Sequence, residues 1–235
     1  MAFTLYLAMT GAEIRNCSSP PEHIAWMACH FSPYSTGLSN IPSVLLPGSM
    51  LILNDRVPPQ GHDPATVAEQ LGRAVTQLEV SRVLLDFQRF EDPLTKEIAE
   101  AITSALPCPM AVTPAYAEGL DCAVFLTPQL HKPLADQLEL WQGRTVWLEA
   151  ATDCQEAILT EEGCTFIPGD LPEDPSDFHS DAQACCRYHI ALENDRVRFT
   201  LWREADHLQA LLCEAEKLGI DCAVGLYQQL KHYDI

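Results

Sequence analysis

The sequence is poor in basic side chains. Only 14 lysine and arginine residues stand against 33 aspartate and glutamate residues in a chain of 235, which gives a net charge of −19 at pH 7. A surface this negative repels phosphate groups, both those of nucleic acids and those of anionic membranes. We therefore expect an acidic protein with neither a nucleic-acid partner nor a membrane partner.

The sequence also lacks long apolar runs and the pattern of a secretion signal. No run approaches the roughly 20 apolar residues that a membrane-spanning helix needs. The start of the chain, 1–10, has only a brief apolar run with no basic region before it, which predicts a first strand rather than a signal peptide. We expect a cytoplasmic protein.

The motifs of several classes of site are missing. Ten cysteines are present, but no C-x-x-C pair occurs, and the histidines do not have the spacing of a zinc site. The neighbouring Cys185 and Cys186 suit neither a disulfide staple nor a zinc knuckle. The dinucleotide-binding G-x-G-x-x-G, the P-loop and the G-x-S-x-G elbow do not occur. We expect reduced thiols, no metal and no cofactor.

What the sequence does contain is an alternation of strand-like and helix-like segments. Short apolar runs alternate with segments whose apolar residues recur at helical spacing. Two of these helices begin with Asp-Pro, at 63–64 and 92–93, where Asp caps and Pro opens a helix. Eight strands with crossover helices predict an α/β fold, a (β/α)8 TIM-type barrel, with an open doubly wound sheet as the alternative. The predicted strands are 3–9, 49–53, 82–86, 109–113, 122–127, 144–149, 197–202 and 221–226.

Two regions depart from this alternation. Ile24–Cys29 is an apolar patch within the long connection 11–48, and we expect it to form one or two helical turns that pack in the core. Between residues 151 and 196, two β-hairpin patterns surround an acidic, proline-containing loop. We expect a single barrel-like domain over 1–235, with the 151–196 hairpins and acidic loop inserted between strands six and seven.

Polar residues at the carboxyl ends of the predicted strands would share one barrel mouth. The strand Arg82–Leu85 runs directly into Asp86 and Gln88. Carboxylates beside aromatic rings suit a sugar, because rings stack on its apolar face and carboxylates accept hydrogen bonds from its hydroxyl groups. The candidate catalytic residues are Asp86 and Glu149, and the candidate ligand-binding residues are Asp55, Gln88, Tyr116, Gln129, Trp202 and Tyr227.

The stretch Val83-Leu-Leu-Asp-Phe-Gln88 resembles the signature strand of the family-18 glycoside hydrolases, the chitinase-like barrels, which reads D-x-x-D-x-D-x-E. The resemblance implies a TIM barrel. It implies that Asp86 stands where the family has the aspartate that orients the substrate's N-acetyl group. Gln88 then stands where the family has the glutamate that acts as general acid. Ser81 and Leu84 occupy the positions of the other two aspartates.

The sequence leads to three functional hypotheses. Because Gln88 cannot protonate a leaving group, the first is a glycoside hydrolase-like barrel that binds a carbohydrate-like ligand without turnover or has another non-catalytic role. The second is an active glycosidase in which Asp86 works with Glu149 or Asp55 as an ordinary carboxylate pair. The third is a protein-interaction module that uses the hairpins of 156–202, and it requires an exposed apolar patch there.

Overall fold

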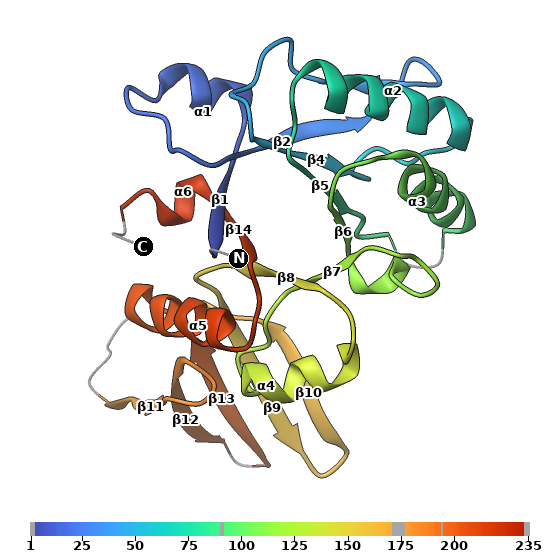
Figure 1. The fold of residues 1–235 in the computed structure, drawn as a ribbon. Helices are drawn as coiled ribbons and strands as arrows, with labels where there is room; N and C mark the ends of the chain where they lie inside the picture. The colour runs from blue at the N-terminus through green and yellow to red at the C-terminus, as the bar shows by residue number, and fades with distance from the viewer. Residues whose placement is uncertain (1–2, 90–91, 171–176, 194, 233–235) are drawn as a thin grey trace.

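Eight parallel strands close into a barrel in the computed structural model, which describes residues 3–89, 92–170, 177–193 and 195–232 (Figure 1). Each strand pairs with the next around the ring, and the pairing of β1 with both β14 and β2 closes it. The TIM-type barrel predicted from the sequence is therefore confirmed. The barrel strands are β1 (Thr4–Met9), β2 (Ile24–Phe31), β4 (Met50–Asn54), β5 (Arg82–Asp86), β6 (Met110–Val112), β7 (Ala123–Leu126), β8 (Val146–Ala150) and β14 (Cys222–Leu226).

Helices of uneven length surround the barrel. The connection from β2 to β4 carries the short strand β3 (Leu38–Ser39), antiparallel to β2, in place of a helix. The connection from β6 to β7 carries only one 3₁₀ turn. The helical elements are α1 (Gly11–Asn16), α2 (Pro64–Gln77), α3 (Pro93–Ala105), η1 (Pro114–Tyr116), α4 (Leu134–Leu138), η2 (Glu139–Trp141), α5 (Ala205–Lys217) and α6 (Tyr227–Leu230).

The two Asp-Pro pairs begin helices as predicted. The Asp63 carboxylate accepts a hydrogen bond from the Thr66 backbone N–H at 2.8 Å, and Asp92 accepts one from the Leu94 N–H at 3.1 Å. Each bond satisfies a backbone donor that has no partner within the helix, which contributes about 1 kcal/mol per cap. The capped helices α2 and α3 pack against each other on the outside of β4 and β5.

The apolar core has three main layers. One fills the barrel interior, a second lies between the strands around β5 and helices α2 and α3, and a third lies between β8, β14 and helix α5. The interior layer comes from alternate residues of the strands, as the period-two geometry of a strand requires. It includes Tyr6, Ala25, Met50, Ile52, Leu84, Phe125, Trp147 and Val224.

The segment expected to form helical turns at Ile24–Cys29 is instead barrel strand β2. Its burial was predicted correctly, since Ile24, Ala25 and Cys29 are buried. The helical expectation was wrong because a continuous apolar run fits a strand buried on both faces as well as it fits a buried helix. With β2 in the ring, the strand that carries Asp86 is the fourth of the barrel in chain order.

The strand predicted at 197–202 is not part of the barrel. It is β13 (Arg196–Trp202), the central strand of a separate antiparallel sheet in the order β10-β9-β13-β12-β11. The insertion therefore lies between the seventh and eighth barrel strands, β8 and β14, rather than between strands six and seven. The other strands of this inserted sheet are β9 (Cys154–Thr160), β10 (Gly163–Pro168), β11 (His179–Asp181) and β12 (Cys186–Glu193).

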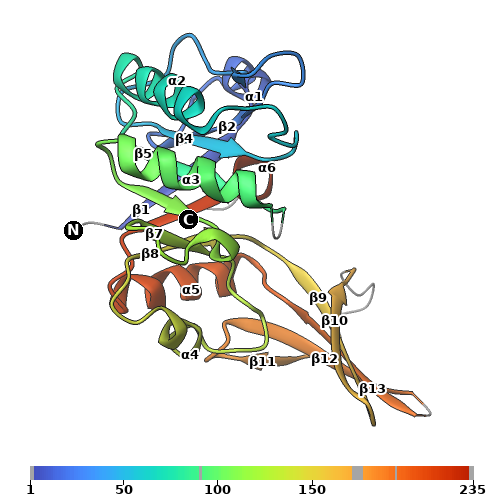
Figure 2. The same cartoon turned by 90° about the vertical axis from the view of Figure 1, so that its right-hand side faces the viewer.

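The inserted sheet projects from one side of the barrel (Figure 2). Both predicted hairpins are present in it, as β9–β10 and β12–β13. Residues 171–176, which belong to the expected acidic loop, lie outside the described residues. Among the described residues, no helix is long and apolar enough to cross a membrane.

Candidate functional site

A cavity of about 710 Å³ opens at the carboxyl ends of the barrel strands. Its inner wall is apolar and includes Met27, Ile52, Leu84 and Phe125, while its rim carries the polar groups. This is the end of the barrel at which TIM barrels place their active sites. The polar and charged residues that line it are Thr10, His30, Asn40, Asn54, Asp55, Arg56, Asp86, Gln88 and Glu149.

Three of these residues lie side by side on neighbouring strands. His30 on β2 is directly opposite Asn54 on β4, and Asn54 is directly opposite Asp86 on β5. The Asn54 amide donates to the carbonyl groups of Met27 at 3.1 Å and Cys29 at 3.0 Å, within and at the end of the register shift in β2. Asn54 thus holds the irregular part of β2 against β4.

The Asp86 carboxylate is held by its neighbour along the chain. The Gln88 side-chain amide donates to Asp86 Oδ1, with a nitrogen-to-oxygen distance of 2.5 Å. Burial raises the pKa of the Asp86 carboxyl, and repulsion by Asp55 adds to the rise, while the hydrogen bond from Gln88 opposes it. Gln88 therefore orients Asp86 and favours its ionised form.

Glu149 lines the same cavity from β8. Thr127, which follows β7, donates its hydroxyl to Glu149 Oε2 at 2.5 Å. Burial raises the pKa of the Glu149 carboxyl, the hydrogen bond from Thr127 opposes this, and repulsion by Asp86 and Asp153 raises it further. The two candidate catalytic residues thus share one cavity and interact electrostatically.

Asp55 also lines the cavity, but its carboxylate has a structural task. It is only 3% exposed, and its two oxygens accept the backbone N–H groups of Gln88 at 2.9 Å and Arg89 at 2.8 Å. The Arg89 side chain donates a hydrogen bond from Nε to the Asp55 carbonyl oxygen at 3.0 Å. These bonds fix the path of the chain after β5 and hence the position of the Gln88 side chain.

Four predicted ligand-binding residues lie outside the lining of this cavity. Tyr116 is buried between the strands and helix α3, with its ring 5.9 Å from that of Phe87 in an edge-on arrangement. Gln129 is exposed in the loop after β7, and its backbone bonds to the Gln137 side chain. Trp202 is buried in the inserted sheet against Phe178, and Tyr227 contacts Cys17 at the start of α6.

The sequence analysis missed His30, because β2 was expected to be helical, and it missed Asn40, which follows the short strand β3. His30 Nδ1 lies 2.6 Å from the Phe31 carbonyl oxygen, and His30 Nε2 lies 3.0 Å from the Asn40 amide nitrogen. These two contacts fit a neutral ring protonated at Nδ1, with Nε2 accepting from Asn40. The available signal was the polar His30 near the end of an apolar run, the same pattern that identified Asp86.

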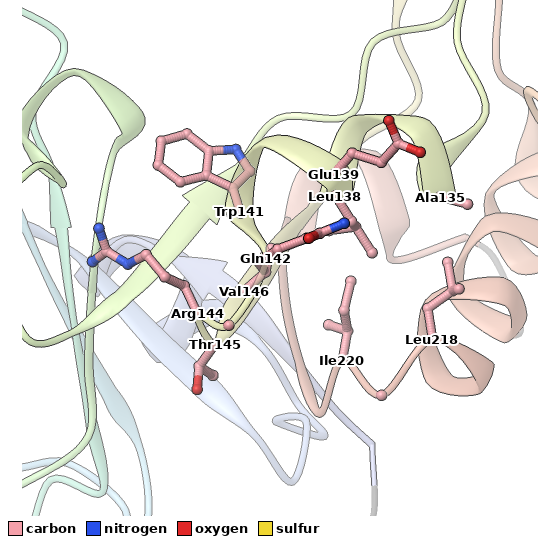
Figure 3. A pocket seen from close by; sticks show the side chains of 12 residues that line it. Ala135, Leu138, Glu139, Trp141, Gln142, Arg144, Thr145, Val146, Leu218 and Ile220 are labelled. Atoms are coloured by element: carbon pink, nitrogen blue, oxygen red, sulfur yellow. The ribbon is translucent and has the colours of Figure 1, made fainter.

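A second hollow of about 550 Å³ lies outside the barrel, between η2 and the end of α5 (Figure 3). It is lined mainly by Leu138, Trp141, Arg144, Leu218 and Ile220, near the amino ends of β8 and β14. That end of a TIM barrel serves stability, and this hollow contains no pair of carboxylates. Among the described residues, no group of three or more His, Cys, Asp or Glu side chains could hold a metal ion. The mouth cavity is therefore the candidate site.

Comparison with known proteins identifies the fold. The chain is similar to a family-18 glycoside hydrolase, an N-acetylglucosaminidase from Paenibacillus barengoltzii, with 11% identity, a TM-score of 0.59, and coverage of 95% of this chain and 94% of that one. It is similar to a chitinase from Chromobacterium violaceum, with 8% identity, a TM-score of 0.56, and coverage of 95% and 93%.

A third similar structure contains a ligand. It is a family-18 chitinase from Cycas revoluta, a double mutant in which one glycine is replaced by tryptophan and one glutamate by glutamine, in complex with (GlcNAc)4. Its identity to this chain is 11%, its TM-score is 0.58, and the match covers 96% of this chain and 95% of that one. No protein-family model and no curated protein matches the sequence. The chain therefore has the fold of the family-18 barrels, as its resemblance to their signature strand predicted.

Proposed function

We propose that the mouth cavity binds an oligosaccharide of N-acetylated sugars without cleaving it. The observation that carries this proposal is the Gln88–Asp86 pair. Gln88 stands where the family-18 signature has its acidic glutamate, and its amide is bound to Asp86 at 2.5 Å within the cavity. An amide has no proton to give to a leaving group at ordinary pH, so this arrangement can bind a sugar but lacks the acid.

The cavity has the properties that a sugar ligand needs. Its apolar inner wall, which includes Phe125, can contact the apolar face of a sugar ring. The carboxylates of Asp86 and Glu149 can accept hydrogen bonds from hydroxyl or amide groups. The Cycas revoluta chitinase, which has a similar fold, holds (GlcNAc)4 in a mutant with glutamate replaced by glutamine. That complex supports an oligosaccharide of this class as the first ligand to test.

An active glycosidase is the second candidate, and one observation favours it. Asp86 and Glu149 repel each other in a partly buried site, and both have a raised pKa. Such a pair can supply one protonated acid and one ionised carboxylate. Asp55 is a weaker partner for this role, because both of its oxygens already accept backbone N–H groups.

Product analysis after incubation with (GlcNAc)4 separates the two candidates. We expect the wild-type protein to leave the tetramer intact and Gln88→Glu to acquire slow hydrolysis, because a positioned general acid typically contributes about 10²–10⁴-fold. Glu149→Gln, made in the Gln88→Glu background, tests whether Glu149 takes part in the new activity. Hydrolysis by the wild-type protein that Glu149→Gln abolishes would instead establish the glycosidase.

A further inference from the structure

The two faces of the inserted sheet differ in charge. Residues directly opposite each other on paired strands share a face. On one face the pairings place eight uncharged side chains in two adjacent rows across four strands. The rows are Phe166, Ala157, Phe199 and Ile190, followed by Cys164, Leu159, Val197 and Leu192.

The opposite face carries the charges. Arg198 forms ion pairs with Glu156 and Glu193, each at 3.0 Å, and Glu193 is also paired with Arg196. The same face also carries Ile158 and Ile167, and Trp202 is buried on it near the barrel. The ion-paired side chains are thus confined to one face, and the two uncharged rows give the other face an apolar surface on which a partner can dock.

The apolar face is covered only near the barrel. There Ala157 and Leu201 are buried and pack with Leu130. In the same two rows, Leu192 is 83% exposed and Leu159 is 44% exposed, and Ile190 and Phe166 are each 40% exposed, with one side of the Phe166 ring stacked on His131. These side chains come from three strands, and the rows join them through Phe199 and Val197 of β13 into one patch. The hairpins that carry them project beyond the barrel (Figure 2). Contiguous exposed patches of this kind mark interaction sites.

The acidic side chains on the hairpin turns favour a basic partner. The turns at the hairpin tips carry Glu161, Glu162 and Asp195, and none of these forms an ion pair with another described residue. A second copy of this chain would bring the same acidic turns and a further net charge of −19 toward them. A basic partner would instead be attracted.

We infer that the exposed apolar face of the inserted sheet docks a basic amphipathic helix of another protein. The apolar stripe of the helix would cover Leu159, Ile190 and Leu192, and its lysine or arginine residues would face the acidic turns. Four strands about 4.8 Å apart span about 14 Å, which a helix of roughly ten residues covers at 1.5 Å per residue. This site is separate from the barrel mouth and does not depend on the function proposed for it.

Fluorescence anisotropy with synthetic peptides tests the inference. The probe is a labelled 14-residue helix with a leucine stripe and lysine on the other face. Its controls are the same peptide with glutamate in place of lysine and a scrambled leucine–lysine peptide. We expect saturable binding of the leucine–lysine helix and at least tenfold weaker binding of both controls.

Protein variants separate docking on the face from general charge attraction. Leu192→Glu should weaken binding of the leucine–lysine helix at least tenfold. Leu159→Glu, on a neighbouring strand, should do the same. The matched control is Thr165→Glu, which adds the same charge to an exposed position on the opposite face and should change binding less than twofold. Circular dichroism would verify that each variant is folded.

Three results would overturn the inference. Unchanged or tighter binding to Leu192→Glu would show that charge alone holds the peptide, because this variant is more negative. No saturable binding to the wild-type protein would exclude the helix as the occupant. Light scattering that shows a wild-type dimer, dissociated by Leu192→Glu, would assign the face to a second copy of the chain.

Discussion

The two ends of the barrel interior differ in whether their charged side chains form ion pairs. At the amino ends of the strands, Arg82 pairs with Asp221 at 3.2 Å, and its guanidinium lies 5.1 Å from the centre of the Trp147 ring. At the carboxyl ends, neither Asp86 nor Glu149 forms an ion pair with a described residue. Arg82 and Asp86 belong to the same strand, β5, so the contrast arises within one element.

Strand β5 thus carries a charge with an ionic partner at one end and a carboxylate without a described ionic partner at the other. A paired charge contributes to the folded state, whereas partly buried carboxylates without a cationic partner oppose their own burial. Their retention at the mouth is expected where a ligand supplies the missing hydrogen-bond donors. The proposed function thus assigns folding to the amino end of the barrel and binding to the carboxyl end.

The largest expected effect on stability comes from removing the Arg82–Asp221 ion pair. Arg82→Ala should lower the free energy of unfolding by about 2–3 kcal/mol. The loss of one partner of a buried ion pair costs about 3–5 kcal/mol, and the Arg82 and Asp221 side chains are still 17% and 18% exposed. Urea denaturation measures this change.

Arg73→Ala is the matched control for Arg82→Ala. Arg73 pairs with Glu69 across one helical turn of α2, and both side chains are more than half exposed, so its loss should cost less than about 0.5 kcal/mol. Equal destabilisation by the two variants would remove the distinction between a structural pair and a surface pair.

A smaller effect is expected from Asp55, the mouth carboxylate with a structural task. Asp55→Ala should cost about 2 kcal/mol, because the backbone N–H groups of Gln88 and Arg89 lose their acceptors. Asp86→Asn, in the same cavity, should leave the free energy of unfolding unchanged or slightly increased. Thermal unfolding of both variants would measure the difference, and a larger loss for Asp86→Asn would reverse the assigned roles.

The smallest expected effect is a change in the pH dependence of stability. The folded-state pKa of Glu149 is raised above its ordinary value of 4.5, chiefly by burial. Between those two values the folded state binds the extra proton, so stability falls as the pH rises through this window. Glu149→Gln removes this titration and should raise the melting temperature of the protein near neutral pH.

Thermal melts of wild-type protein and Glu149→Gln measure this effect. The two melting temperatures should coincide at about pH 3, where Glu149 is protonated in both the folded and the unfolded states. They should separate toward neutral pH, with the variant higher. A variant that melts below the wild-type protein at neutral pH would show that the Glu149 charge is stabilising and has a partner.

Local signals in the sequence were sufficient to predict helix starts and strand ends where a residue type has one main structural role. Asp63 and Asp92 cap helices because an aspartate carboxylate before proline accepts a hydrogen bond from a backbone N–H group that is free at the helix start. The strand leading to Asp86 was located because its short apolar run ends abruptly in polar residues. The same reasoning placed Glu149 at the end of its strand, and both carboxylates line the mouth cavity.

Long-range pairing could not be predicted from such signals. The strand Ile24–Phe31 has apolar residues on both faces, so periodicity did not separate it from a buried helix. The strand Arg196–Trp202 alternates and leads into a helix, as a barrel strand does, but its partners are antiparallel hairpin strands. Tyr116 follows a strand end, yet the 3₁₀ turn at 114–116 carries its ring into the core against Phe87 rather than into the mouth.

The most direct test of the account is a calorimetric titration of (GlcNAc)4 into the wild-type protein and into Asp86→Asn, with recovery of the sugar afterwards. We predict saturable binding to the wild-type protein, at least tenfold weaker binding to Asp86→Asn, and an intact tetramer. Equal binding by the two proteins, or none by either, would contradict the claim that the carboxylates at the mouth are kept for a sugar ligand.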